Sequence, residues 1–190
     1  MIVLASASPR RQELLRNAGI SFVVQAANIP ESPSPGEAPR ALAERLAREK
    51  ASAIFRQRPN DVVLGADTIV VVDGQILGKP QDADDAARML RLLSGRSHQV
   101  ITGVCLMGPG KSRTGLEDVR SETTLVTVTA FRDEDIYPYI ATGEPMDKAG
   151  AYAIQGAASR WISRIEGDYF NVVGLPVALV YKMLREHGVV

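Results

Sequence analysis

An acidic residue stands in the middle of a strongly apolar stretch of the chain. Residues 62–72 are VVLGADTIVVV, so Asp67 separates two runs with the length and β-branched content of strands. Burying an unpaired carboxylate is costly. Asp67 therefore either lies at an opening in a sheet or meets a cation or a hydrogen-bond donor. The alternative is an aspartate that satisfies a local turn. A strand-end carboxylate is also a natural metal ligand or general base.

Strands and helices alternate irregularly around this stretch, and several strands form hairpins. Asp73-Gly74 is a hairpin turn signal. The pattern therefore predicts a mixed α/β sheet rather than a regular doubly wound one. Strands are expected at 2–5, 20–25, 61–72, 75–77, 99–107 and 123–131, with extended segments at 161–165 and 170–173. Helices are expected at 9–18, 38–55, 82–94, 133–141 and 176–187, and long loops at 28–36 and 108–122.

The bulk properties narrow the class of protein. A chain of 190 residues fits one domain, or one domain with two lobes, and we expect a single domain over 1–190. With 22 basic and 22 acidic residues, the chain lacks the basic excess of proteins that coat nucleic acid or anionic membranes. We therefore expect no nucleic-acid or membrane partner, and no signal peptide or membrane span is recognisable. One cysteine, Cys105, excludes an intrachain disulfide and favours a reducing compartment, with the thiol buried as a small hydrophobe.

A candidate anion site follows the first predicted strand. Ser8 and Pro9 resemble a helix start, and Arg10 and Arg11 fall in the first helical turn. Free N–H groups at a helix start attract anions, and guanidinium groups bind phosphate bidentately. Cations there oppose the helix dipole, so an anionic ligand would explain them better than local stability. The alternative is two solvated surface arginines.

Three further polar residues are weaker candidates by themselves. Lys50 lies on or beside the apolar stripe of its helix, where a stem that snorkels to solvent is the simple explanation. Lys79 follows the predicted hairpin as a loop lysine. Gln155 offers both a donor and an acceptor, as reading a base edge requires, although a glutamine that caps backbone is the more usual case. A P-loop-like segment at 108–112 lacks the first glycine and joins two strands, so we expect only a loop there.

Taken together, six motifs in order resemble the Maf family of nucleoside triphosphate pyrophosphatases. The resemblance runs nearly end to end. The motifs are LASASPRRQELL, LAREKA, GADTIVVVDGQILGKP, SGRSHQVITGV, DKAGAYAIQG and IEGDYFNVVGLP. It implies a Maf/ITPase-like α/β fold, with a mixed elongated sheet flanked by helices and two lobes around a deep cleft. It also implies a cytoplasmic location, and a homodimer as an assembly that such proteins often form.

The resemblance also implies a reaction and a site. The expected reaction is hydrolysis between the α and β phosphates of a nucleoside triphosphate, with Mg²⁺ or Mn²⁺. Asp67 matches the family's proton acceptor and Glu31 an acid that helps to bind metal. Pro30 stands where a second acid is usual, which puts the number of metal ligands in doubt. The residues expected around the triphosphate are Ser8, Arg11, Lys50 and Lys79.

Three positions distinguish branches of the family, and here they are Arg10, Thr68 and Gln155. This set resembles the branch that acts on dTTP and UTP, and modified pyrimidine nucleotides are a variant of the same expectation. Glutamine can both donate and accept, which suits the O4 and N3–H of uracil or thymine, whereas glutamate only accepts. A different class of function stays open at this point: a regulatory protein that senses nucleotides, without turnover, in the arrest of septum formation.

Overall fold

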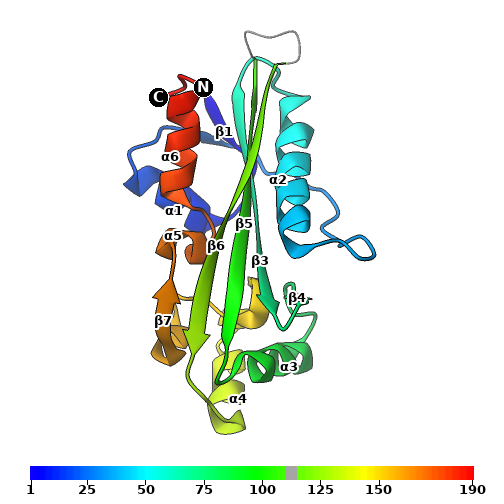
Figure 1. Cartoon of the computed structure of the whole chain (residues 1–190), viewed down its shortest axis with the longest axis vertical. Coiled ribbons are helices and arrows are strands. Elements are labelled where there is room, and N and C mark those ends of the chain that lie inside the picture. Colours follow the sequence, from blue (N-terminus) through cyan, green and yellow to red (C-terminus); the bar gives the residue numbers. More distant parts are fainter. Residues whose placement is uncertain (110–114) are drawn as a thin grey trace. The chain divides into compact units, whose positions relative to one another are not determined.

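The computed structural model describes residues 1–109 and 115–190 (Figure 1). Its strands share one mixed sheet in the order β2-β1-β3-β5-β6-β7, and β4 pairs with β3. β1 runs parallel to β2 and β3, whereas β4 and β7 are antiparallel to β3 and β6. The predicted mixed sheet flanked by helices is confirmed. The strands are β1 Ile2–Leu4, β2 Val23–Val24, β3 Val62–Val72, β4 Gln75–Leu77, β5 Ser97–Gly108, β6 Leu116–Val128 and β7 Ile162–Glu166.

The chain divides into two compact units that share the three long strands β3, β5 and β6. The first unit comprises Met1–Thr68, Thr102–Glu122 and Gly174–Val190. The second comprises Ile69–Ile101 and Thr123–Val173.

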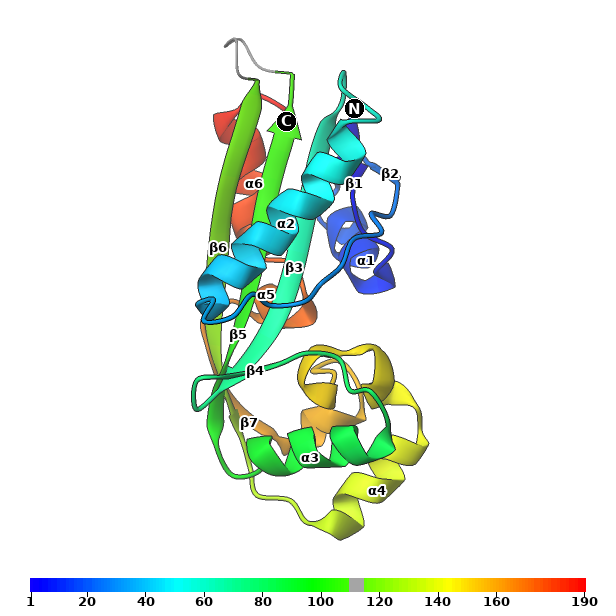
Figure 2. The same cartoon turned by 90° about the vertical axis from the view of Figure 1, so that its right-hand side faces the viewer.

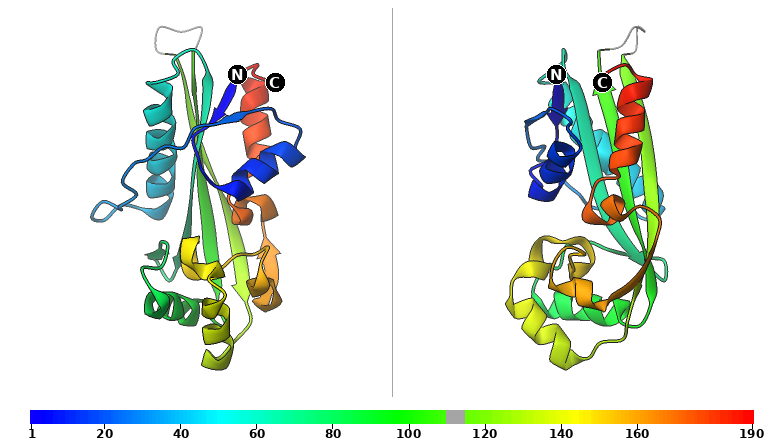
Figure 3. Two further views of the ribbon diagram at one scale, coloured as in Figure 1. Left: turned by 180° about the vertical axis from the view of Figure 1, so that it is seen from behind. Right: turned by 90° about the vertical axis from the view of Figure 1, so that its left-hand side faces the viewer.

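In the first unit, helices cover both faces of the strands. α2 (Pro39–Phe55) lies on one face, and α1 (Pro9–Asn17) and α6 (Val177–Glu186) lie on the other (Figures 1 and 3). Glycines let α2 approach closely: a Cβ added at Gly65 would lie 2.2 Å from the Ala47 carbonyl oxygen, and one added at Gly103 would lie 2.2 Å from that of Ala43. The backbone of α2 therefore rests directly on β3 and β5, which brings its side chains close to the centre of β3.

In the second unit, α3 (Ala83–Leu93) and α4 (Asp133–Ala141) lie on one side of the strands (Figure 2). Two short 3-10 turns pack with these helices, η1 (Glu144–Asp147) and η2 (Ala149–Ala151), and a third, η3 (Ala157–Trp161), packs against β7. The aromatic core of this unit is centred on Trp161, which stacks on Phe131 at 4.5 Å between ring centroids and meets the edge of Tyr139 at 5.2 Å.

Several local predictions are confirmed. Ser8 and Asp82 cap α1 and α3, each accepting a hydrogen bond from the N–H three residues along. Asp73 and Gly74 both have positive φ, 48° and 76°, as a two-residue hairpin turn with the right twist requires. Of the predicted strand 20–25, only Val23–Val24 pairs, with β1. None of the described helices has the length and apolar character needed to cross a bilayer.

The expected loop at 108–122 is wrong at its C-terminal end, where residues 116–122 begin the long strand β6. Their polarity made them resemble a loop, but their side chains find charged and polar partners within the first unit. Glu117 pairs with Arg48 at 2.9 Å, and the Ser121 hydroxyl donates to Glu44 at 2.6 Å. Residues 110–114 of this predicted loop lie outside the described part of the chain.

The expected extended segment at 170–173 is also wrong, because Tyr169–Val173 forms the short helix α5. The Asp168 carboxylate accepts a hydrogen bond from the Phe170 N–H at 2.7 Å, which initiates the helical turn. Asn171 then points inward, and its amide donates to the Val100 carbonyl oxygen at 2.9 Å. A capping aspartate and a buried amide outweigh the apolar, β-branched appearance of the segment.

Candidate active site

Two acids and a lysine form an ion cluster in the first unit. The Lys50 ammonium lies 2.6 Å from an Asp67 carboxylate oxygen and 2.6 Å from a Glu31 carboxylate oxygen. Lys50 and Asp67 are each only 7% exposed, whereas the Glu31 side chain reaches solvent. Such a cluster satisfies both buried charges, each of which would otherwise be strongly destabilising.

This cluster decides between the alternatives for Lys50 and Asp67. Lys50 does not snorkel to solvent, since its ammonium points inward to Asp67. Asp67 does not serve a turn, because it lies in the middle of the uninterrupted strand β3. Helix α2 places Lys50 above the strand, and the 28–36 loop brings Glu31 to the same nitrogen. Of the alternatives that the sequence left open for Asp67, the structure shows contact with a cation, the Lys50 ammonium.

A buried arginine organises the neighbouring part of the unit. The Arg11 guanidinium donates to the Gly174 carbonyl oxygen at 2.7 Å, to the Ser6 hydroxyl at 3.2 Å and to the Thr68 hydroxyl at 3.0 Å. Burial lowers the pKa of Arg11, and the charges of Asp67 and Glu31 act in the opposite direction. Arg11 is therefore not a solvated surface arginine.

Thr68, on β3, links this arginine to the neighbouring strand β5. Its hydroxyl lies 3.0 Å from the Thr102 hydroxyl on β5 and 3.3 Å from the Gly174 carbonyl oxygen. Ser6, Thr102 and Gly174 were not singled out from the sequence. Thr102 is fully buried. Its hydroxyl within an apolar strand needs a hydrogen-bond partner, and this is the signal that could have identified it from the sequence.

The helix α1 is capped by Ser8 as predicted, but the two arginines of its first turn differ in exposure. The Ser8 hydroxyl accepts a hydrogen bond from the Arg11 N–H at 3.5 Å, a long contact. Arg10 is partly exposed beside it. The helix start thus presents one partly exposed arginine and one buried arginine.

The two acids suit a hard divalent cation, as the chemistry of their oxygen atoms indicates. Mg²⁺ and Mn²⁺ prefer oxygen ligands, and Mg²⁺ is usually held by one or two carboxylates with water and substrate phosphates. Glu31 and Asp67 already converge on one cationic atom, the Lys50 nitrogen. Among residues 1–109 and 115–190, no group of three or more metal-binding side chains exists, so a cage made entirely of protein ligands is not present there. The donor set therefore fits a cation shared with water and phosphate.

Lys79 and Gln155 belong to the second unit. Both side chains are exposed. A backbone hydrogen bond connects the segments that carry them: the Gly150 N–H donates to the Gly78 carbonyl oxygen at 3.0 Å. Within the described residues the Gln155 amide makes no hydrogen bond, so it does not cap backbone there.

A buried histidine anchors the same region of the second unit. His98 Nε2 lies 2.7 Å from the Tyr152 hydroxyl, and burial lowers the pKa of His98 to about 4. In the described part of the chain, Nδ1 of His98 has no hydrogen-bond partner. In the first unit, burial likewise raises the pKa of the Cys105 thiol to about 12, which agrees with its expected role as a buried hydrophobe.

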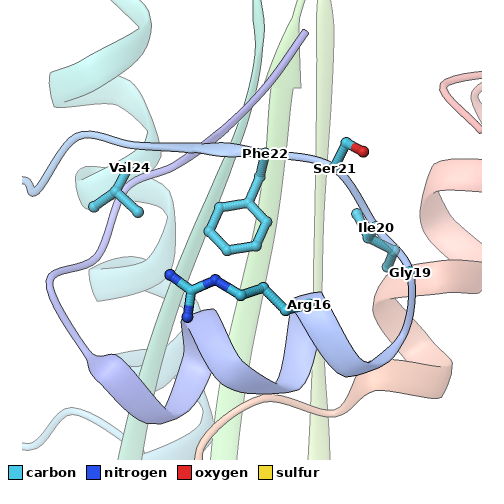
Figure 4. Close-up of a pocket in the computed structure, with 6 residues that line it drawn as sticks. All are labelled: Arg16, Gly19, Ile20, Ser21, Phe22 and Val24. Carbon is cyan, nitrogen blue, oxygen red and sulfur yellow. The ribbon is translucent and has the colours of Figure 1, made fainter.

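A surface pocket of about 430 Å³ in the first unit is separate from the ion cluster of Glu31, Lys50 and Asp67. It lies between the end of α1 and the segment that leads to β2, where Arg16 extends beneath the Phe22 ring (Figure 4). None of its lining residues is a predicted site residue. They are Arg16, Gly19, Ile20, Ser21, Phe22 and Val24. The ion cluster around Lys50 is the better candidate for an active site.

Comparison with known proteins gives the family. The chain is 60% identical over 188 residues to a dTTP/UTP pyrophosphatase of Koribacter versatilis, covering 99% of this chain and 95% of that protein. It is 55% identical over 187 residues to a dTTP/UTP pyrophosphatase of Geobacter sulfurreducens, covering 98% and 96%. A solved dITP/XTP pyrophosphatase of Mycobacterium abscessus superposes with a TM-score of 0.44 and 17% identity, covering 68% of this chain and 74% of that one. The family model of the Maf-like proteins matches residues 1–187, and the chain belongs to this family.

Proposed function

We propose that this protein hydrolyses dTTP and UTP to the nucleoside monophosphate and pyrophosphate, with a divalent cation. The observation that carries the proposal is the convergence of Glu31, Lys50 and Asp67, in a chain 60% identical to a dTTP/UTP pyrophosphatase. A carboxylate held in a fixed position in a site of this kind can orient water and accept its proton.

Asp67 is the proposed catalytic residue. One of its carboxylate oxygens accepts a proton from the attacking water, as the bond between the α and β phosphates breaks and pyrophosphate leaves. Glu31 and Asp67 are the proposed ligands of Mg²⁺ or Mn²⁺, which when bound supplies positive charge and acidifies water. The pH dependence of kcat in Asp67 variants separates the role of base from that of metal ligand.

Cationic side chains are proposed to bind the triphosphate. A phosphoryl-transfer transition state gains most from fixed positive charge. Lys50 is already held near the two acids, and Arg11 uses three of its five N–H groups in the bonds described above, which leaves two for phosphate. Lys79 and the Ser8 hydroxyl are proposed to complete this set.

Selectivity for uracil and thymine is assigned to Arg10, Thr68 and Gln155. The exposed Gln155 amide can donate to O4 and accept from N3–H of the base. Thr68 acts through its place in the Arg11 network rather than as an isolated hydroxyl. A cytoplasmic location and a homodimer remain predictions.

The test is a panel of triphosphates assayed for pyrophosphate with Mg²⁺ or Mn²⁺. We expect release from dTTP and UTP in preference to dCTP, GTP and 7-methyl-GTP, and competition with base-modified analogues measures their relative use. No release from any triphosphate with either metal would refute the enzyme assignment. A bound nucleotide that stays intact for hours would instead favour the nucleotide-sensing role.

A further inference from the structure

The turn that carries Gln155 is closed by its own backbone. The Gly156 N–H donates to the Ala153 carbonyl oxygen at 3.1 Å, which places Gln155 at the exposed tip. Ile154, just before it, is buried and fixes the turn to the second unit. The backbone position of Gln155 therefore depends on what holds the two ends of the turn.

Two side chains from outside the turn hold both of those ends. The Tyr139 hydroxyl accepts a hydrogen bond from the Ala153 N–H at 3.3 Å and donates to Glu144 Oε1 at 2.8 Å. Glu144 Oε2 accepts a hydrogen bond from the Ala157 N–H at 3.2 Å. The pair thus forms a continuous hydrogen-bonded bridge from residue 153 to residue 157.

The bridge is itself rigidly supported. Tyr139 is only 1% exposed and packs edge-on against Trp161. A Cβ added at Gly156 would fall 2.0 Å from Glu144 Oε1, so the carboxylate packs directly against the backbone beside Gln155. A side chain at residue 156 would displace the carboxylate, and with it the bridge.

We propose that Tyr139 and Glu144 are positioning residues that set the base selectivity of the enzyme by fixing the turn that carries Gln155. The inference rests on the proposed function, in which Gln155 contacts the base. The amide presents a donor on one side and an acceptor on the other, and cytosine presents the reverse of the thymine pattern. A turn held in place keeps Gln155 at one position in the second unit, whereas a loosened turn lets the residue shift, which weakens the discrimination of its amide between the two bases.

The test compares Tyr139→Phe with Tyr137→Phe. Both remove one hydroxyl from α4, but Tyr137 is 53% exposed and lies away from the bridge. For Tyr139→Phe we expect the ratio of kcat/KM for dTTP over dCTP to fall roughly threefold to tenfold, the worth of one or two hydrogen bonds. The KM for dTTP should rise more than kcat falls. Tyr137→Phe should retain the wild-type ratio.

A double-mutant cycle separates positioning from a general loss of structure. If Tyr139 acts through Gln155, Tyr139→Phe has no further effect on the ratio in a Gln155→Ala background. An equal loss in both backgrounds would overturn the proposal. Glu144→Gln keeps only one of the two acceptor oxygens that the bridge uses, so its ratio should lie between those of the wild type and Glu144→Ala, and Glu144→Ala should match Tyr139→Phe.

Different results would overturn the proposed function and the positioning role. If the wild-type enzyme releases no pyrophosphate from dTTP or UTP, the proposed function fails and this inference fails with it. If the wild-type enzyme is active and selective but Tyr139→Phe and Glu144→Ala keep its ratio, only the positioning role is overturned. If Gln155→Ala leaves the ratio unchanged, the assignment of base selectivity to Gln155 is overturned together with the positioning role, whereas the proposed hydrolysis stands.

Discussion

The Asp67 carboxylate lies 2.6 Å from the Lys50 ammonium inside the first unit, and both residues are buried. Two charges removed from water to this degree persist only as partners. Glu31 meets the same ammonium from the solvent side, which makes an acid-rich group at the centre of β3. This arrangement has consequences for activity, stability and cation binding that can be measured separately.

Replacing Asp67 with asparagine should abolish most of the activity. Asparagine has nearly the same shape but cannot take a proton from water, so we expect kcat to fall by about 10²–10⁴-fold. Pyrophosphate release from dTTP measures the loss. Asp73→Asn is the matched control, because Asp73 lies in the exposed turn directly after β3 and asparagine tolerates its φ of 48°. A wild-type rate in Asp67→Asn would exclude Asp67 as the base.

Replacing Lys50 with methionine should destabilise the fold. The stem would still pack, but Asp67 would be left buried without its cation, at a cost of about 3 kcal/mol in the free energy of unfolding. Urea denaturation without added divalent cation measures this difference. Lys182→Met is the control: that lysine is 66% exposed and pairs weakly with Glu186 at 3.9 Å, so we expect a change below about 1 kcal/mol. Equal stability of the two variants would show that the Lys50 pair contributes nothing net.

Millimolar Mg²⁺ or Mn²⁺ should raise the melting temperature of the wild-type protein. At a concentration about tenfold above Kd, binding adds about 1.4 kcal/mol, or a few degrees in Tm for a chain of this size. Glu31→Gln should lose the shift, because it removes one of the two proposed ligands, and a chelator should reverse it in the wild-type protein. Glu13→Gln, on the exposed side of α1, should keep the shift. A shift that persists in Glu31→Gln would place the cation elsewhere.

Acid should destabilise the protein through His98. Burial lowers the pKa of His98 to about 4, against about 6.5 in an unfolded chain. Between these values the unfolded state binds the additional proton, so stability falls as the pH is lowered from 6.5 to 4. The expected loss is on the order of 3 kcal/mol, and urea denaturation at several pH values measures it.

The histidine variants test this assignment. His98→Gln should flatten the fall in stability over that range, since glutamine does not titrate but can still bond to the Tyr152 hydroxyl. His187→Gln replaces the other histidine, which is exposed, and should retain the fall. An equally steep fall in His98→Gln would assign the proton uptake to another group.

Local signals in the sequence determined much of the framework. Ser8 and Asp82 begin helices because their oxygen atoms satisfy N–H groups of their own first turns. Asp73 and Gly74 form a hairpin because both tolerate positive φ. Each of these features depends on neighbours in the chain, so it is legible without knowledge of the tertiary structure.

Longer-range features needed the tertiary structure. Residues 116–122 form a strand rather than a loop because distant partners such as Arg48 and Glu44 satisfy their side chains. Lys50 turns inward because Gly65 and Gly103 let α2 approach the sheet, which brings Asp67 within reach of its ammonium. Helical periodicity placed Lys50 beside an apolar stripe, but it contains no information about a carboxylate on another element.

Asp67 shows most clearly which features the sequence determines and which depend on the tertiary structure. Its place between two apolar runs determined, from the sequence alone, that a buried carboxylate there needs a partner, because an isolated buried charge is too costly. Only the tertiary structure decided that Lys50 is the partner and that Glu31 shares it, since the contact joins residues from a strand, a helix and a loop. Composition and spacing specify what a residue requires, whereas the packing of distant segments determines what meets that requirement.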